Sequence, residues 1–433
     1  MTKKYLGALI GNIMQFYDFT IYAFLTKEIS ECFFNFENQF MAYFVALSIF
    51  ATGYITRPVG ALLFGYFGDK KGRSWALSKT IIISTLTTFL IGITPGYQSI
   101  GMIAPISLVI LRLLQGLSVS GEEGGAVVLL FENTRFQRRG LLGAAVLASV
   151  LLGVVLGIFV CSTTNLLISH GLIGEWGWRI PFLISLPLGI LAIFLRFYLN
   201  DFKLFERAKE NNVLVAKPCW TLFRNYLWPI IFGITLVAIY SITTSTLIVH
   251  LPYYLTEKLH FLREDSQFIV GAAILFVVLL TLVIGHYCDR WDAWRIYYGG
   301  SIGTLIFSPI LFWMMAQNNV GLIMIAILIF CCLISLISAA LFSILVGLFP
   351  FSVRYSGVSL AFNLCITIFS STTPLILIII EKSVSNVFLP GVYISGVSAL
   401  NLMVMNILSR KITVSDFSQH KHEELLYRAT QSY

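Results

Sequence analysis

Long apolar stretches separated by short polar segments make up almost the entire chain of 433 residues. A helix that crosses a membrane needs about 20 consecutive apolar residues, and most of these stretches reach that length. We therefore predict twelve membrane-spanning helices, six on each side of one longer polar segment. The predicted spans are 5–26, 40–67, 76–95, 101–131, 140–168, 180–199, 227–255, 266–288, 296–316, 321–349, 357–380 and 387–409.

The composition supports a membrane protein over a soluble one. Hydrophobic residues make up 57% of the chain and charged residues 12%, about half the charged share of a typical soluble domain. The seven cysteines lie mostly in apolar stretches without the spacing of a metal site or a redox motif. We interpret them as buried side chains, and we expect neither a metal nor a secreted disulfide scaffold. The first span carries Asn12, Gln15 and Asp18, so we do not interpret it as a cleavable signal peptide.

The positive charges indicate how the chain is oriented. With the N-terminus inside, 22 of the 29 Lys and Arg residues fall on the cytoplasmic side and five on the outer side. Cytoplasmic loops carry such an excess, so we predict that both termini are cytoplasmic. The same rule accounts for the net charge of +8 without a nucleic-acid partner. We interpret 200–226 as a cytoplasmic linker and 410–433 as a cytoplasmic tail.

An internal repeat divides the chain into two similar halves. The pattern Gly-x-x-x-Asp followed by a basic residue occurs at 65–70 and again at 285–290, 220 residues later, after the second and eighth spans. Matched loops in the same orientation indicate two halves related by an axis along the membrane normal. The predicted fold class is an all-α integral membrane protein. Its twelve transmembrane helices form two pseudo-symmetric six-helix bundles, 1–199 and 227–409.

Residues 65–73 match every fixed position of G-x-x-x-D-[RK]-x-G-[RK], and the chain thereby resembles the major facilitator superfamily. Further motifs resemble its metabolite:H⁺ symporters, which include proline/betaine, α-ketoglutarate, citrate and shikimate transporters. They lie at 11–19, 57–60, 112–122, 176–182 and 349–363. Two departures stand out, because Gln15 replaces the Glu of the first-span motif and Glu123 replaces an aromatic residue.

The resemblance implies a secondary active transporter, not an enzyme, in the inner membrane of a bacterium. We expect alternating access and proton-coupled symport of a small polar metabolite. The substrate would be a zwitterion such as proline or betaine, or a mono- or dicarboxylate. No cofactor beyond the proton gradient is expected, and we expect the protein to work as a monomer. Two alternatives stay open: a proton-independent exchanger or uniporter, which Gln15 favours, and a transporter-like sensor without net flux.

A polar stripe runs along the first span. Because neighbours on a helix are 100° apart, its members share one arc of about 120° that should face the bundle interior. It consists of Asn12, Gln15, Asp18 and Tyr22, and the motif adds the adjacent Tyr17. The stripe either lines a cavity, with Asp18 as a proton carrier, or joins helices through hydrogen bonds.

A second stripe runs along the fourth span and contains Arg112, Gln115, Ser118, Glu122 and Glu123. A charge at the bilayer centre costs at least about 2.5–3.5 kcal/mol, so Arg112 needs an anionic partner, either Asp18 or a substrate carboxylate. Two adjacent buried carboxylates do not both stay ionised, so Glu122 and Glu123 are candidates for the proton path. Alternatively, they brace the inner helix ends.

Two further buried side chains are candidates for the substrate or proton path. Arg57 precedes Pro58 inside the second span, where it either binds an anionic group or braces a kink. His250 is the one ionisable side chain that we predict deep in the second half. It is either a proton relay or a hydrogen-bonded interior residue.

The resemblance also implies a cytoplasmic gate at the inner helix ends. We predict that the pairs Asp69–Arg73, Glu132–Arg139 and Asp289–Arg290 lock one access state. Alternatively, these charges only determine topology. The complete set is Gly65, Asp69, Lys70, Gly72, Arg73, Glu132, Arg139, Asp289, Arg290 and Arg354.

Overall fold

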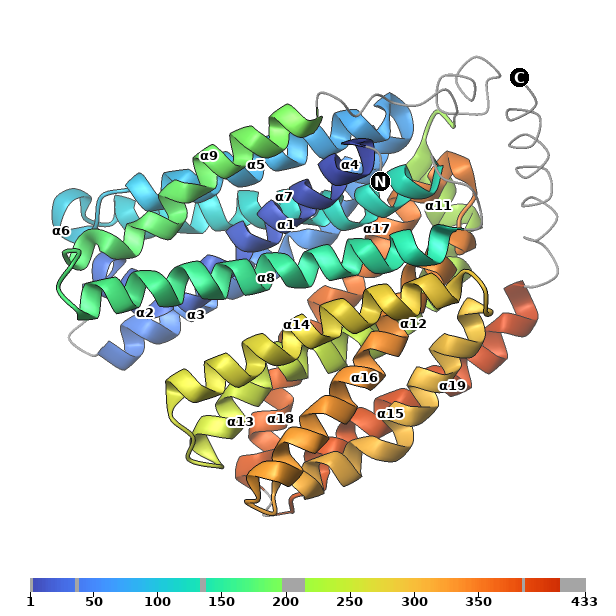
Figure 1. Ribbon diagram of the computed structural model, residues 1–433. Helices are drawn as coiled ribbons and strands as arrows, with labels where there is room; N and C mark the ends of the chain where they lie inside the picture. The colour runs from blue at the N-terminus through green and yellow to red at the C-terminus, as the bar shows by residue number, and fades with distance from the viewer. Residues whose placement is uncertain (1–2, 36–38, 133–137, 197–214, 384–385, 413–433) are drawn as a thin grey trace.

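The computed structural model describes residues 3–35, 39–132, 138–196, 215–383 and 386–412, and these residues contain helices and no strand (Figure 1). The predicted tail from residue 413 onward and the predicted linker up to residue 214 lie outside the described residues. The boundary between the two halves therefore stays a prediction.

The first half consists of six spans, and the second of them is divided into two helices. The predicted span 40–67 is two helices that meet at Thr56, directly before Arg57 and Pro58. Pro58 has no amide hydrogen and suits the first turn of a new helix, which explains the division. The helices are α1 (Lys3–Phe24), α2 (Thr26–Phe33), α3 (Gln39–Ile55), α4 (Arg57–Lys71), α5 (Arg73–Ile93), α6 (Tyr97–Ile100), α7 (Ile103–Glu132), α8 (Arg139–Ser169), η2 (Glu175–Arg179) and α9 (Ile180–Arg196).

The second half begins with α11 (Pro218–Asn225), a short helix inside the predicted linker. Two of its spans contain one turn of π-helix, η3 (Thr246–His250) and η6 (Ile366–Ser370). The remaining elements are α12 (Leu227–Ser245), α13 (Leu251–Glu257), α14 (Arg263–Cys288), α15 (Ala293–Met315), α16 (Val320–Leu345), η4 (Val346–Leu348), η5 (Phe351–Val353), α17 (Arg354–Cys365), α18 (Ser371–Ser383) and α19 (Leu389–Ile412).

Ten helical segments among the described residues are long and apolar enough to cross a membrane. Two further spans complete the predicted twelve. One is α1, which carries the polar stripe, and the other is the divided pair α3 and α4. The polar stripe makes α1 less apolar than the other ten spans. The break at Thr56 makes α3 and α4 each shorter than those spans. The all-helical membrane fold predicted from the sequence is confirmed.

The two groups of helices approach each other at one end of the molecule and diverge toward the other (Figure 1). One apolar cluster contains residues of α7 and α8 together with residues of α12, α16 and α17, so it joins the two halves. A second cluster, around Tyr17 and Tyr22, lies wholly in the first half. At one end of the molecule, α4 and α7 pack against α17, and the end of α14 meets the start of α8. We call this end the closed end.

Glycines allow helices to approach within backbone contact. A Cβ atom on Gly153 of α8 would lie 2.4 Å from the carbonyl oxygen of Ile13 in α1. A Cβ atom on Gly60 of α4 would lie 2.2 Å from the carbonyl oxygen of Leu117 in α7. Small residues serve this purpose in membranes, where helices associate through close packing.

We predict that Gly153→Ala destabilises the protein, because the added methyl group meets backbone and not a movable side chain. Overpacking of this kind costs about 1–3 kcal/mol, so the midpoint of thermal unfolding in detergent should fall by several degrees. The matched control is Gly271→Ala in α14, where an added Cβ has no neighbour within 4 Å. Equal midpoints for the two variants would contradict the prediction.

Candidate functional site

The polar side chains of α1 point into the first bundle, and three of them bond to three different helices. Asn12 donates to the carbonyl oxygen of Val146 at 3.0 Å and to Ser149 at 2.8 Å, both on α8. Tyr17 donates to the carbonyl oxygen of Pro181 on α9 at 2.6 Å. Tyr22 donates to the carbonyl oxygen of Ala46 on α3 at 3.1 Å. These three side chains join helices through hydrogen bonds, as in the second of the two interpretations of the stripe.

Gln15 and Asp18 lie deeper, where α1 meets α5 and α7. Gln15 Nε2 is 3.4 Å from Ser118 Oγ on α7, and the carboxylate of Asp18 accepts a hydrogen bond of 3.1 Å from Ser84 on α5. Gln115 of α7 donates to the carbonyl oxygen of Asp18 at 2.8 Å and to Thr88 at 2.7 Å. The predicted stripes on the first and fourth spans therefore face each other within one bundle.

Arg112 is surrounded by aromatic rings, although the sequence suggested a carboxylate partner. Its guanidinium carbon lies 4.3 Å from the ring centroid of Tyr22 and 4.8 Å from those of Phe19 and Phe50. It also donates to the side-chain oxygen of Gln115. Its Nε is buried and has no hydrogen-bond partner among the described residues. Cation–π contacts thus stabilise this buried cation, and part of its donor capacity is unused.

Arg57 lies against the same group of aromatic rings. Its guanidinium carbon is 4.5 Å from the ring centroid of Phe19 and 4.7 Å from that of Tyr54. Its Nε also lacks a hydrogen-bond partner in the described part of the chain. Phe19 packs edge-on against Tyr54, with ring centroids 5.2 Å apart. We call Phe19, Tyr22, Phe50 and Tyr54 the aromatic cluster; it contacts both buried arginines.

Glu122 and Glu123 face different neighbours, although they are adjacent in the sequence. Glu122 pairs with Arg196 at the end of α9 and accepts a hydrogen bond of 2.8 Å from Thr80. Glu123 is buried in the field of the Arg57 charge, and its Oε2 has no hydrogen-bond partner within the described ranges. The two carboxylates therefore have separate neighbours, and a place for either of them in the proton path stays a prediction. Successive helix positions point about 100° apart, and Glu122 braces the bundle through a cation that the sequence did not indicate.

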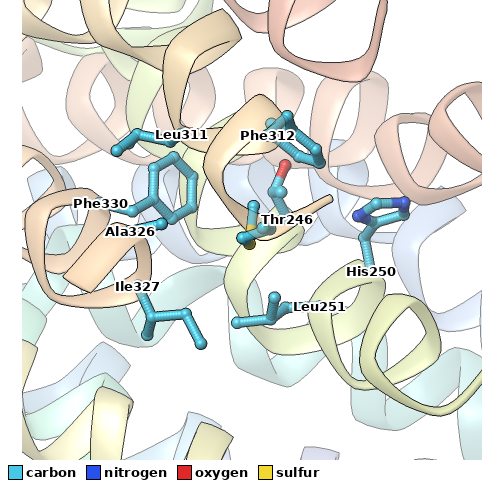
Figure 2. A pocket seen from close by; sticks show the side chains of 9 residues that line it. Thr246, His250, Leu251, Leu311, Phe312, Ala326, Ile327 and Phe330 are labelled. Atoms are coloured by element: carbon cyan, nitrogen blue, oxygen red, sulfur yellow. The ribbon is translucent and has the colours of Figure 1, made fainter. Parts of the chain in front are cut away.

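His250 has a carboxylate partner that the sequence analysis missed. Its Nε2 lies 3.0 Å from Oε1 of Glu381 in α18, and both side chains are buried. The predicted eleventh span ended at residue 380, so Glu381 was assigned to the outer loop. The expectation of a single buried ionisable group in the second half is therefore wrong. His250 also borders a small apolar cavity, opposite Ile327 and Phe330 (Figure 2).

At the closed end, Asp69 of the first half caps a helix of the second half. Its carboxylate accepts hydrogen bonds from the amides of Tyr355 and Ser356, at 3.2 and 3.0 Å, and from the Ser356 hydroxyl at 2.7 Å. These groups form the first turn of α17, where free amides and the helix dipole stabilise an anion. The predicted pair with Arg73 is also present, at 3.4 Å.

Asp289 makes the symmetry-related contact in the opposite direction. It follows α14 of the second half and accepts from the amides of Gly140 and Leu141, at 2.7 and 3.1 Å, in the first turn of α8. Arg290 is exposed to the surroundings. The predicted Asp289–Arg290 pair is thus replaced by a contact with a helix N-terminus. The internal repeat corresponds to two reciprocal caps between the halves.

Arg73 and Glu132 form a buried ionic group beside the first cap. Arg73 Nε lies 3.0 Å from Glu132 Oε2, and Arg73 donates to the carbonyl oxygen of Phe351 at 3.0 Å. Arg354 Nη1 lies 3.6 Å from Glu132 Oε1. We predicted Arg139 as the partner of Glu132; the guanidinium of Arg139 lies 5.8 Å from the ring centroid of Phe131. Glu132 therefore holds one cation from each half.

Two glycines of the predicted gate have identifiable structural roles. Gly72 joins α4 to α5 with a φ of 111°, a conformation that side chains disfavour. A Cβ atom on Gly65 would lie 2.6 Å from the Cα atom of Ser356. Lys70 is exposed and contacts the Tyr66 hydroxyl at 2.9 Å. Gly65 thus allows α4 to approach α17, whereas Lys70 lies beside the caps.

Comparisons with known proteins identify the family and the fold of the chain. The family model described as Major Facilitator Superfamily matches residues 8–374. The proline/betaine transporter of Escherichia coli (strain K12) is 30% identical over 412 residues, covering 93% of this chain and 82% of the relative. The glycine betaine/proline/ectoine/pipecolic acid transporter OusA of Dickeya dadantii has the same identity and the same two coverages.

A solved structure shows the same fold. The proton:xylose symporter XylE bound to 6-bromo-6-deoxy-D-glucose matches with a TM-score of 0.74. The match covers 93% of this chain and 94% of that chain at 15% identity. At this identity the likeness concerns the fold alone.

We predict that Asp69→Asn shifts the protein away from the closed arrangement. A helix cap contributes about 0.5–2 kcal/mol, so the ratio of closed to open molecules should fall by up to about 30-fold. Spin labels on the exposed positions Lys71 and Trp291, in a background without other cysteines, would report a longer-distance population. Asp265→Asn changes an exposed carboxylate of α14 and is the control. An unchanged distance distribution in Asp69→Asn would refute the role of the cap.

Proposed function

The chain belongs to the major facilitator superfamily, and we propose that it is a proton-coupled symporter of a small zwitterionic metabolite. It is a transporter and not an enzyme, as its curated relatives are. The names of those relatives include proline and betaine, which carry one carboxylate and one cationic nitrogen. Zwitterions are one of the two substrate classes expected from the sequence.

The observation that carries this proposal is the arrangement of charges around the aromatic cluster. Arg112 and Arg57 are buried with unused donors, and guanidinium groups bind carboxylates through charge-assisted hydrogen bonds. When a substrate carboxylate draws a guanidinium toward itself, ring faces become available to a cation. The unpartnered oxygen of Glu123 adds negative charge in the same region. One anionic and one cationic substrate group thus have complementary partners.

The alternative substrate, a mono- or dicarboxylate, would bind to the arginines and would make no contact with Glu123. A dicarboxylate could engage both Arg57 and Arg112, whereas the aromatic faces and Glu123 would have no substrate cation to bind. These two features favour the zwitterion. Uptake competition between the two classes distinguishes them.

In alternating access, the two reciprocal caps would form in one state and break in the other. With both termini in the cytoplasm, as the positive charges indicate, the closed end faces the cytoplasm. The structure would then correspond to an outward-facing state, in which Asp69 and Asp289 hold the inner helix ends together. Release of these caps would open the path inward, and the binding site near the aromatic cluster would change its exposure.

Proton coupling is supported by family resemblance, and Gln15 stands where related symporters carry a Glu. Of the three carboxylates predicted for the proton path in the first half, Asp18 and Glu123 remain as candidates, since Glu122 is paired with Arg196. A proton-independent exchanger or uniporter remains the rival mechanism. A sensor without net flux is the second rival, and counterflow would exclude it.

We predict that purified protein in liposomes accumulates proline or glycine betaine when an inward proton gradient is imposed. The panel also includes α-ketoglutarate, citrate and shikimate, each with and without a protonophore. Loss of accumulation with the protonophore supports symport, while accumulation that persists supports the exchanger. Protein-free liposomes are the control. Counterflow of none of the five compounds would contradict the proposed substrate classes.

We predict that Arg112→Gln raises the KM for the transported zwitterion at least about tenfold, because charge-assisted hydrogen bonds contribute about 1.5–3 kcal/mol. Arg295→Gln removes an exposed arginine outside the predicted gate and should leave KM unchanged. The measurement is the initial rate of counterflow over a range of substrate concentrations. Unchanged KM in Arg112→Gln would place the binding site elsewhere.

A further inference from the structure

The His250–Glu381 pair is a buried acid–base pair outside the region assigned to the substrate. It connects the seventh and eleventh spans, near the end at which the two halves diverge. Burial of a charge in this region requires a partner, because an isolated ion in a low-dielectric interior costs several kcal/mol. Nε2 of His250 and Oε1 of Glu381 lie 3.0 Å apart without hydrogen-bond geometry, and a single proton on either side chain keeps the pair neutral overall.

Each of the two spans that carry the pair contains a π-turn. His250 is the last residue of the π-helical turn η3, and Pro252 follows at the start of α13. The eleventh span contains the second π-turn, η6, and Ser245 donates to the carbonyl oxygen of Ser370 at 2.7 Å. π-Turns of this kind often mark functional positions. Here α13 and α18 are short segments that follow such turns and are joined by the pair.

Among the described residues, few other charged side chains lie close to the pair. Lys258 donates to the backbone oxygen of Glu381 at 3.4 Å, and the Glu381 charge acts on Tyr253 and Tyr254. Glu257 acts on Tyr253 from the exposed end of α13. From other elements, Phe312 of α15 contacts the imidazole, and Tyr393 of α19 contacts Thr373 of α18.

The net charge of the His250–Glu381 pair depends on how many protons it binds, and therefore on pH. With one proton, the pair is either imidazolium and carboxylate or imidazole and carboxylic acid, and it is neutral in both forms. When that proton leaves to the external water, a neutral imidazole and a carboxylate remain, with one uncompensated buried charge. Glu381 would then have to reach water, which pulls α18 away from α13.

We infer that His250 and Glu381 form a proton-binding site for the external solution that holds α13 against α18 and thereby controls transport. The inference rests on the proposed transport function but does not require proton-coupled uptake. Gln15 is unrelated to this site, since it lies in the first bundle.

Counterflow in liposomes at equal internal and external pH tests the inference, with the pH varied from acidic to alkaline. The wild type should lose counterflow as pH rises, because the pair gives up its proton, by about tenfold for each pH unit beyond the transition. Glu381→Gln is uncharged at every pH and should show a flat profile. Glu257→Gln, an exposed carboxylate on α13, should retain the wild-type profile. His250→Gln provides a second variant, whose transition should move.

Infrared titration of the purified protein provides a readout that does not depend on transport. The protonated pair gives a carboxylic-acid band in one of its two forms and an imidazolium band in the other. The band that is present should decrease with rising pH in the wild type, and this component should be missing or moved in Glu381→Gln and retained in Glu257→Gln. A wild-type pH profile and an intact band in a monodisperse Glu381→Gln variant would overturn the inference. Absence of counterflow from the wild type, with the band behaving as expected, would overturn the proposed transport function while supporting the proton site.

Discussion

The contact that organises the molecule is a carboxylate of one half at the helix N-terminus of the other. Asp69 caps α17 and Asp289 caps α8, so the two halves hold each other through reciprocal caps. Such a contact is strong only when the amides of the first turn point directly at the oxygens. The contact is therefore either made or broken, as is required of a contact that distinguishes two discrete arrangements of the halves. The glycines at 65 and 140 are required because larger side chains would separate the same helices.

Spans, halves and polar stripes could be predicted because each follows from local sequence. Apolar length predicts a span, and a repeated loop predicts a repeated half. The inward direction of the α1 stripe also follows, since polar groups avoid lipid. Whether that stripe lines a cavity or joins helices depends on which neighbours approach. Asn12, Tyr17 and Tyr22 each bond to a different helix, a fact of packing that no single stretch contains.

Spacing along the sequence could not predict which charged side chains pair with each other across the bundle. The spacing of Glu132 and Arg139 suggested a pair along the chain, whereas Arg73 and Arg354 approach Glu132 in space. Arg196 lies near the inner end of its span in the sequence, yet it ends α9 inside the first bundle and pairs there with Glu122. Glu381 was placed outside its span because the apolar stretch ends one residue earlier, while α18 continues to Ser383. A hydropathy boundary marks where composition changes, and a helix ends only where its backbone bonds end.

The two halves share a fold but divide their buried charges unequally. The first half holds two arginines against the aromatic cluster, with a carboxylate whose oxygen is unpartnered among the described residues. In its described part, the second half holds the acid–base pair His250–Glu381, on two spans that each contain a π-turn. Unused donors and acceptors in the first half are costly unless a ligand completes them. In the second half, Nε2 of His250 and Oε1 of Glu381 lie 3.0 Å apart, close enough for a single proton to pass between them. The asymmetry therefore separates two tasks: the first half is built to bind a charged molecule, and the second to respond when that single proton is lost.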